Sequence, residues 1–190
     1  MTATEDLRAE HEGVLRMLDI LRAIVVRINA GQAESGQIDA GQAVPVTHLE
    51  SILEFLRVFV DKCHHGKEED ILFPALEQGG VTREGGPIGV MLQEHALGRG
   101  HIRDMGAALA GQGGLSAFVA PALAYAELLT QHIAKENNIL FVMADRLLGA
   151  PALTQMHEAF ERLEAERIGP GRHEAFHRLL DDLAAEYLAA

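Results

Sequence analysis

Apolar residues recur every three or four positions along most of the chain, which predicts amphipathic helices. The predicted helices cover about residues 5–30, 45–78, 88–109, 116–148, 151–167 and 171–188. Thr2 and Glu5 are spaced as a capping box at the start of the first helix. No stretch alternates convincingly with a period of two, so we predict an all-α protein.

Four long helices joined by modest loops are typical of an up-down-up-down four-helix bundle. We therefore expect a bundle domain over residues 1–150 and a C-terminal helical extension over residues 151–190 that packs on the bundle. Residues 31–44 are rich in Gly, Gln and Ala, which predicts an exposed loop between the first two helices.

Two segments of the chain share a motif of ten residues. The segments 64–73 and 132–141 carry His, Lys, Glu, Ile, Leu and Phe at the same spacing. Each copy has a His-x-x-x-Glu pair, whose side chains lie on one face of a helix because four residues make about one turn. Glu10-His11 in the first helix recurs as Glu94-His95 in the third. The chain therefore looks like two copies of one helical hairpin.

The repeated histidines and glutamates are expected to meet in one layer of the bundle. With a rise of ~1.5 Å per residue, His95 lies ~10 Å from one end of the bundle and Glu68 lies ~15 Å from the same end. Through the repeat, the same estimate brings His11 level with the pair on the fourth helix. The side chains that converge in this otherwise apolar core are His11, His64, Glu68, His95, His132 and Glu136.

A cation must accompany these side chains, because two unpaired carboxylates in an apolar core would cost several kcal/mol each. Six ligands suit two metal ions, with Glu68 and Glu136 bridging and two imidazoles completing each side. Imidazole and carboxylate ligands without sulfur favour iron or manganese, and zinc is a further candidate. His65 and Glu69 have the same spacing as His64 and Glu68, so the alternative register stays open. His65 is also a candidate for an extra ligand.

Composition narrows the classes of function. The chain has 16 Lys and Arg against 28 Asp and Glu, a net charge of -12 and a pI of about 5.2, which disfavours nucleic acid and anionic membranes and favours cations. The single cysteine, Cys63, excludes an internal disulfide and a Cys-rich zinc or iron-sulfur site. The first 30 residues lack a signal-peptide pattern and no continuous apolar run reaches ~18 residues, so we expect a cytoplasmic protein.

These motifs give the chain a specific resemblance. The order of a lone His, His-x-x-x-Glu, a lone His and His-x-x-x-Glu is similar to that of the hemerythrin-like (HHE cation-binding) domain family, over about residues 5–148. The segments 63–69 and 71–74 resemble the helix-two signature of that family. The resemblance implies a bundle that binds two non-haem iron ions with an oxo or hydroxo bridge, held by the six residues named above.

The chain differs from the oxygen-carrying hemerythrins, which have a second His one turn after the lone His of helix three and an Asp-bearing motif in helix four. Here Gly98 and Arg99 occupy that turn, and Glu136 takes the acidic place. The pattern is instead similar to the branch that includes iron-responsive regulators, iron-centre repair proteins that meet nitric oxide, and bacterial proteins with catalase-like activity.

The resemblance therefore implies a protein that binds O2, nitric oxide or peroxide at the metal pair, for sensing, iron storage or delivery, or protection. A di-iron redox enzyme that turns over peroxide or nitric oxide stays open as an alternative. A metal-free helical interaction module is a third reading of the same sequence.

One further motif is not expected to carry the function that its pattern suggests. The segment from His173 to His177 matches the H-E-x-x-H expression of zinc proteases, in which two histidines one turn apart bind zinc. Few residues follow it, so there is little room for a third ligand downstream, and no strand is available to align a peptide. We therefore do not expect a protease. Of the other residues near the motifs, Tyr125 is expected to fill the core, His101 to lie at the surface and Cys63 to be an inert buried thiol.

Overall fold

The structure, a computed structural model, describes residues 1–33 and 44–189. The described residues form helices and contain no strand, which confirms the prediction of an all-α protein. The predicted loop at 31–44 lies mainly outside the described residues, and α1 extends three residues into it. The helical elements are α1 (Ala3–Ala33), α2 (Val46–Glu54), η1 (Phe55–His64), α3 (His65–Lys67), η2 (Glu68–Leu72), α4 (Phe73–Gln78), α5 (Pro87–Leu109), α6 (Gly114–Lys135), η3 (Glu136–Leu140), α7 (Phe141–Arg167) and α8 (Arg172–Tyr187).

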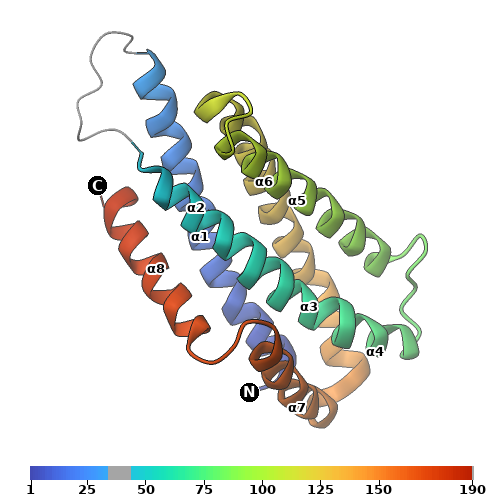
Figure 1. The fold of residues 1–190 in the computed structure, drawn as a ribbon. Coiled ribbons are helices and arrows are strands. Elements are labelled where there is room, and N and C mark those ends of the chain that lie inside the picture. The colour runs from blue at the N-terminus through green and yellow to red at the C-terminus, as the bar shows by residue number, and fades with distance from the viewer. Residues whose placement is uncertain (34–43, 190) are drawn as a thin grey trace.

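Four long helices form the bundle (Figure 1). The first is α1, the second runs from α2 through α4, the third is α5, and the fourth runs from α6 into the first part of α7. The capping box predicted at the start of α1 is present. The Thr2 backbone N–H donates to the Glu5 carboxylate at 2.8 Å, and the Glu5 N–H donates to the Thr2 hydroxyl at 3.3 Å.

Two further helical segments lie on the outside of the bundle. The chain leaves the fourth bundle helix at Gly149, whose φ of 74° and ψ of 161° are not helical, and the rest of α7 continues in a new direction. Glycine adopts such a backbone conformation without steric strain. Gly171 is the N-cap of α8, which lies along α1 and the second bundle helix in Figure 1. Phe176 of α8 packs edge-on against Phe55, with ring centroids 5.5 Å apart. This arrangement is consistent with the expected C-terminal extension, although its boundary at 150 stays a prediction.

The buried apolar residues of the bundle fall into two separate clusters. One cluster includes Leu18, Leu56 and Leu129, and the other includes Leu7, Phe73 and Phe141. Buried histidines and glutamates that belong to neither cluster lie in each bundle helix near the point where one cluster ends and the other begins. The core is therefore interrupted by one polar layer.

The two copies of the ten-residue motif share a departure from α-helical geometry. Each bridging candidate begins a π-helical segment, Glu68 in η2 and Glu136 in η3. In each, the residue after the segment bonds five positions back: the Phe73 N–H donates to the Glu68 carbonyl and the Phe141 N–H to the Glu136 carbonyl. Short π-helical turns are rare and occur frequently at functional sites, because they change which side chains face inward.

The stretch Gly114–Arg167 is long and apolar enough, by length and composition, to pass a test for a membrane-spanning helix. The core helix of a bundle passes the same test, and this stretch supplies buried Tyr125, His132 and Glu136 to the interior.

Candidate metal centre

The polar layer brings together all six residues expected to hold the metal ions. They come from all four bundle helices, and each is at most 2 % exposed. The four Nε2 atoms form two pairs, with His11 and His64 3.0 Å apart on one side and His95 and His132 3.1 Å apart on the other. The layer therefore has two halves, each lined by imidazole nitrogen.

The two glutamates lie between these halves. The Glu68 carboxylate has one oxygen 3.7 Å from the Nε2 of His64 and the other 3.4 Å from the Nε2 of His95. One oxygen of Glu136 lies 3.2 Å from the Nε2 of His11 and 3.3 Å from the Nε2 of His132. Each carboxylate thus contacts both histidine pairs, which is the arrangement that a carboxylate bridging two metal ions requires.

The outer nitrogen of each imidazole has its own acceptor. The four Nδ1 contacts are His11 with the Asn137 side-chain oxygen at 2.9 Å, His64 with Glu10 at 2.8 Å, His95 with Glu69 at 2.7 Å and His132 with Glu94 at 2.9 Å. An Nδ1–H that donates outward leaves the Nε2 lone pair directed into the layer, so these contacts select the tautomer that a metal ion needs.

The internal repeat extends to the residues that support the layer. Lys67 donates to Glu10, the acceptor of His64, and Lys135 donates to Glu94, the acceptor of His132. The two lysines occupy equivalent places in the two copies of the motif. Burial alone would raise the pKa of Glu10, but His64 and Lys67 outweigh it and lower that pKa to about 2. Glu10 is therefore an anionic acceptor throughout the physiological range.

His65 is a seventh side chain in the layer, left open by the sequence. It is 2 % exposed, its ring stacks on that of His95 with centroids 3.8 Å apart, and neither ring nitrogen has a hydrogen-bond partner among the described residues. Burial and the neighbouring histidines His95 and His64 lower its pKa well below the ordinary value, which keeps the imidazole neutral. Its Nδ1 lies 3.5 Å from a carboxylate oxygen of Asp61. A neutral, buried imidazole without a hydrogen bond has the properties of a metal ligand.

The metal-binding capacity of the layer follows from its donor atoms. One oxygen or nitrogen from each of His11, His64, Glu68 and Glu136 lies within 4.8 Å of the others, and the same holds for His65, Glu68, His95 and His132. Both oxygens of Glu68 and of Glu136 are buried without a hydrogen-bond partner among the described residues. Buried carboxylates in this state need positive charge beside them. Protonated His132 supplies part of it in the metal-free protein, and the residues fit a pair of metal ions that would supply it in the loaded one.

The other candidate residues named from the sequence do not lie at the centre of the polar layer. Glu69 points outward to His95 and Arg99, at 2.7 Å each, so the alternative register would not put its carboxylate at the centre. Cys63 lies 3.9 Å from Glu164, and burial raises the pKa of its thiol to about 12, so an unreactive thiol is the better description. Tyr125 is fully buried against Gly98, and its hydroxyl has no hydrogen-bond partner among the described residues.

Comparison with known proteins agrees with this geometry. Residues 2–144 match the family model of the hemerythrin HHE cation binding domain. The chain belongs to this family. Uncharacterized proteins of Mycobacterium bovis and Mycobacterium tuberculosis are each 28% identical to it over 192 residues, which cover 97% of this chain and 68% of the relative. No solved structure matches the chain. Membership of the hemerythrin HHE family establishes a cation-binding domain, while the ligand role of each residue stays a prediction.

Metal binding to the metal-free protein at pH 7 should release protons. Burial alone would lower the pKa of His132, but the Glu136 carboxylate and Glu94 raise it to about 10, so this imidazole must lose a proton before its Nε2 binds a metal ion. The apparent affinity should therefore rise with pH towards 10. The same protonation stabilises the metal-free fold fully below pH 6.5, and that contribution is lost as the pH rises through about 10.

Acidification of a weakly buffered solution on addition of Zn2+ measures the released protons. A His132→Ala variant should release fewer protons per metal ion bound than the parent protein. Equal proton release by the two proteins would show that His132 is not displaced by the metal.

Proposed function

We propose that this hemerythrin HHE protein binds two iron ions in its polar layer, and that the pair binds O2, nitric oxide or peroxide. The observation that carries the proposal is the position of Glu68 and Glu136, whose oxygens lack hydrogen-bond partners among the described residues and lie between two imidazole pairs. Iron suits this mixture of nitrogen and oxygen donors, while manganese and zinc remain candidates that metal analysis would separate.

The two halves of the layer differ in the number of imidazoles. His11 and His64 serve one half, whereas His65, His95 and His132 serve the other. Glu68 and Glu136 would be shared, so the protein would offer five donor side chains to the metal ion of the second half and four to that of the first. The side beside His11 and His64 has fewer protein donors and is our proposed binding place for the small ligand.

The iron pair would supply redox chemistry and affinity for diatomic ligands and peroxide. The protein's own part is to orient the imidazoles through the outer acceptors of their Nδ1 atoms, exclude water and keep the layer electrically balanced. The ligand set is surrounded by two apolar clusters and is almost completely buried, so bulky reactants are excluded. A small gas or peroxide is the class of ligand that such a site admits.

We propose sensing, iron storage or delivery, or protection against such oxidants as the duty of the protein, in the cytoplasm. The single buried thiol and the net charge of -12 support a reducing compartment and partners other than nucleic acid. A redox enzyme using the same iron pair is the alternative, and it differs by turning over many equivalents of peroxide or nitric oxide per protein.

Metal analysis combined with an ultraviolet-visible spectrum tests the proposal. Protein produced with ample iron should contain two iron ions per chain, and an air-exposed sample should gain the near-ultraviolet absorption of an oxo-bridged ferric pair that an anaerobic, reduced sample lacks. Rapid mixing of reduced protein with peroxide then distinguishes a single reaction from repeated turnover. Protein that acquires no stoichiometric metal under these conditions would contradict the proposal.

Replacing His65 by the residue at the equivalent place in the second motif should open a second position for small ligands. Ile133 occupies that place, so His65→Ile is an apolar change for which the chain itself provides a model. The parent protein should bind one nitric oxide per iron pair and the variant two, because the protein would then offer four donor side chains to each half. Spectrophotometric titration of reduced protein with nitric oxide counts the bound molecules.

His101→Ala serves as a control for this experiment, because His101 is not in either group of convergent donor atoms. It should retain the stoichiometry of the parent protein. An unchanged ratio in His65→Ile would assign His65 a packing role only.

A further inference from the structure

The H-E-x-x-H motif of α8 lies beside a third group of convergent metal-binding side chains. One donor atom from each of Glu10, Glu164 and His173 lies within 4.8 Å of the other two. These residues belong to α1, α7 and α8, so the group forms where the two C-terminal helices meet the bundle. The third partner that the sequence did not offer downstream of the motif is supplied from upstream, by Glu164.

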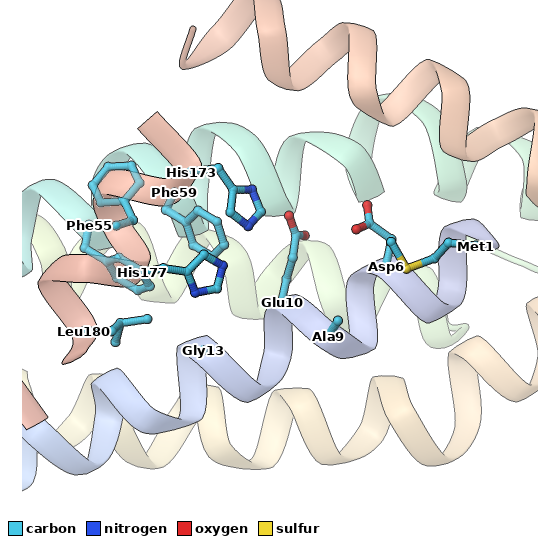
Figure 2. Close-up of a pocket in the computed structure, with 11 residues that line it drawn as sticks. Met1, Asp6, Ala9, Glu10, Gly13, Phe55, Phe59, His173, His177 and Leu180 are labelled. Carbon is cyan, nitrogen blue, oxygen red and sulfur yellow. The ribbon is translucent and has the colours of Figure 1, made fainter. Parts of the chain in front are cut away.

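The two histidines of the motif lie next to one another on α8. Their ring centroids are 4.8 Å apart with an interplanar angle of 28°. Side chains one helical turn apart are expected to be neighbours in this way. The Nδ1 of His173 lies 2.9 Å from a Glu164 oxygen. Figure 2 shows the imidazoles of His173 and His177 side by side, with the Glu10 carboxylate beside them.

Glu10, His173 and His177 line a cavity of about 220 Å³ between α1, η1 and α8, and Glu164 lines a neighbouring cavity that also contains His173. Phe55, Phe59 and Phe176 form its apolar part, and Asp6, Glu10 and the two histidines form its polar part. The cavity has room for a metal ion with water molecules completing its coordination.

The charges around the cavity leave an excess of negative charge. The Lys67 ammonium contacts Asp6 at 3.1 Å, Glu10 at 2.7 Å and Glu164 at 3.1 Å. Three carboxylates and one ammonium leave a net charge of two negative units, before the imidazoles of His64 and His173, which contact Glu10 and Glu164, are counted. Lys67 contacts one oxygen of Glu164, and the other oxygen is the one that faces His173.

We propose that His173, Glu164 and Glu10 bind one divalent transition-metal ion such as Zn2+ or Fe2+, with His177 beside them. One imidazole and two carboxylates supply nitrogen and oxygen donors of the kind that such ions bind, and water fills the remaining positions. This ion is separate from the buried pair, because none of its three ligands belongs to the polar layer. Glu10 joins the two sites, since the same carboxylate accepts the hydrogen bond of His64.

The proposal does not depend on the proposed function of the buried pair, and the experiment separates the two. Glu68→Ala/Glu136→Ala removes the bridging carboxylates of the polar layer and leaves the cavity unchanged. Isothermal titration of this variant, in metal-free form, with Zn2+ should detect one bound ion per chain. No binding to the cavity in this variant would overturn the proposal.

Two changes then identify the ligands. In the same background, His173→Gln should weaken Zn2+ binding by at least about tenfold while keeping a polar side chain against Phe59, and Glu164→Gln should weaken it to a similar extent. His101→Ala in the same background is the matched control and should bind Zn2+ with unchanged affinity. Thermal unfolding in chelator verifies that each variant is folded, and undiminished affinity in both ligand variants would contradict the assignment.

Discussion

Protein carrying both Glu68→Ala and Glu136→Ala should lose the metal ions of the polar layer. Each carboxylate contacts one histidine from each half of the layer, so their removal takes the shared donors from both ions. Loss of a supporting partner alone reduces metal affinity about 10–100-fold, and loss of two bridging ligands should reduce metal content below about a tenth of the parent value. Metal analysis after production in iron-rich medium measures the effect.

Two further variants test whether the loss of metal is specific to the removal of these two carboxylates. Glu50→Ala removes an exposed carboxylate of the second bundle helix and should retain full metal content. His11→Ala removes a ligand from one half only and should reduce metal content less than the double variant. If the double variant keeps the parent content of metal, the polar layer is a metal-free structural feature and the proposed function is wrong.

Much of the fold was predictable because the sequence contains the pattern of one helical hairpin twice. The repeat of His, Lys and Glu at fixed spacing implied two equivalent hairpins, and helical rise put His95 and Glu68 at similar depth. The structure brings them together, with 3.4 Å between the His95 Nε2 and a Glu68 oxygen. Helix spacing and depth are local properties, so periodicity was sufficient to predict them.

The seventh side chain of the layer could not be assigned in this way. His64 and His65 are adjacent, and in a regular α-helix adjacent residues point about 100° apart, so only one should face the layer. The π-helical segment η1 ends at His64, and the His65 N–H donates to the carbonyl of Val60, five residues earlier. This local change in helical register accompanies the burial of both imidazoles, and no spacing rule for α-helices anticipates it.

The supporting contacts were hidden for a different reason. The acceptor of His64 is Glu10, on another helix, and the lysine that neutralises Glu10 sits three residues after His64. Such contacts depend on how the helices pack, which the sequence does not specify residue by residue. The repeated Glu-His pairs of the first and third helices were the available signal, because Glu10 and Glu94 hold equivalent places.

Lys67→Met should destabilise the metal-free protein by about 3–5 kcal/mol, because it removes the one ammonium that Asp6, Glu10 and Glu164 share. The Lys67 side chain is 2 % exposed, so water cannot replace it without opening the contact between α1, α7 and the second bundle helix. Methionine has a similar length and no charge, which isolates the electrostatic effect. Urea unfolding in the presence of chelator measures the change in the free energy of unfolding.

The internal repeat provides the control for this change. Lys135 occupies the equivalent place in the second motif, but its side chain is 36 % exposed and it pairs with Glu94 alone among the described residues. Water screens this pair, so Lys135→Met should cost less than about 1 kcal/mol. Equal destabilisation by the two changes would mean that the three carboxylates around Lys67 do not depend on its charge. A large difference would show that one copy of the repeat has acquired a structural ion cluster, which ties the C-terminal helices to the metal-binding layer through Glu10 and Glu164.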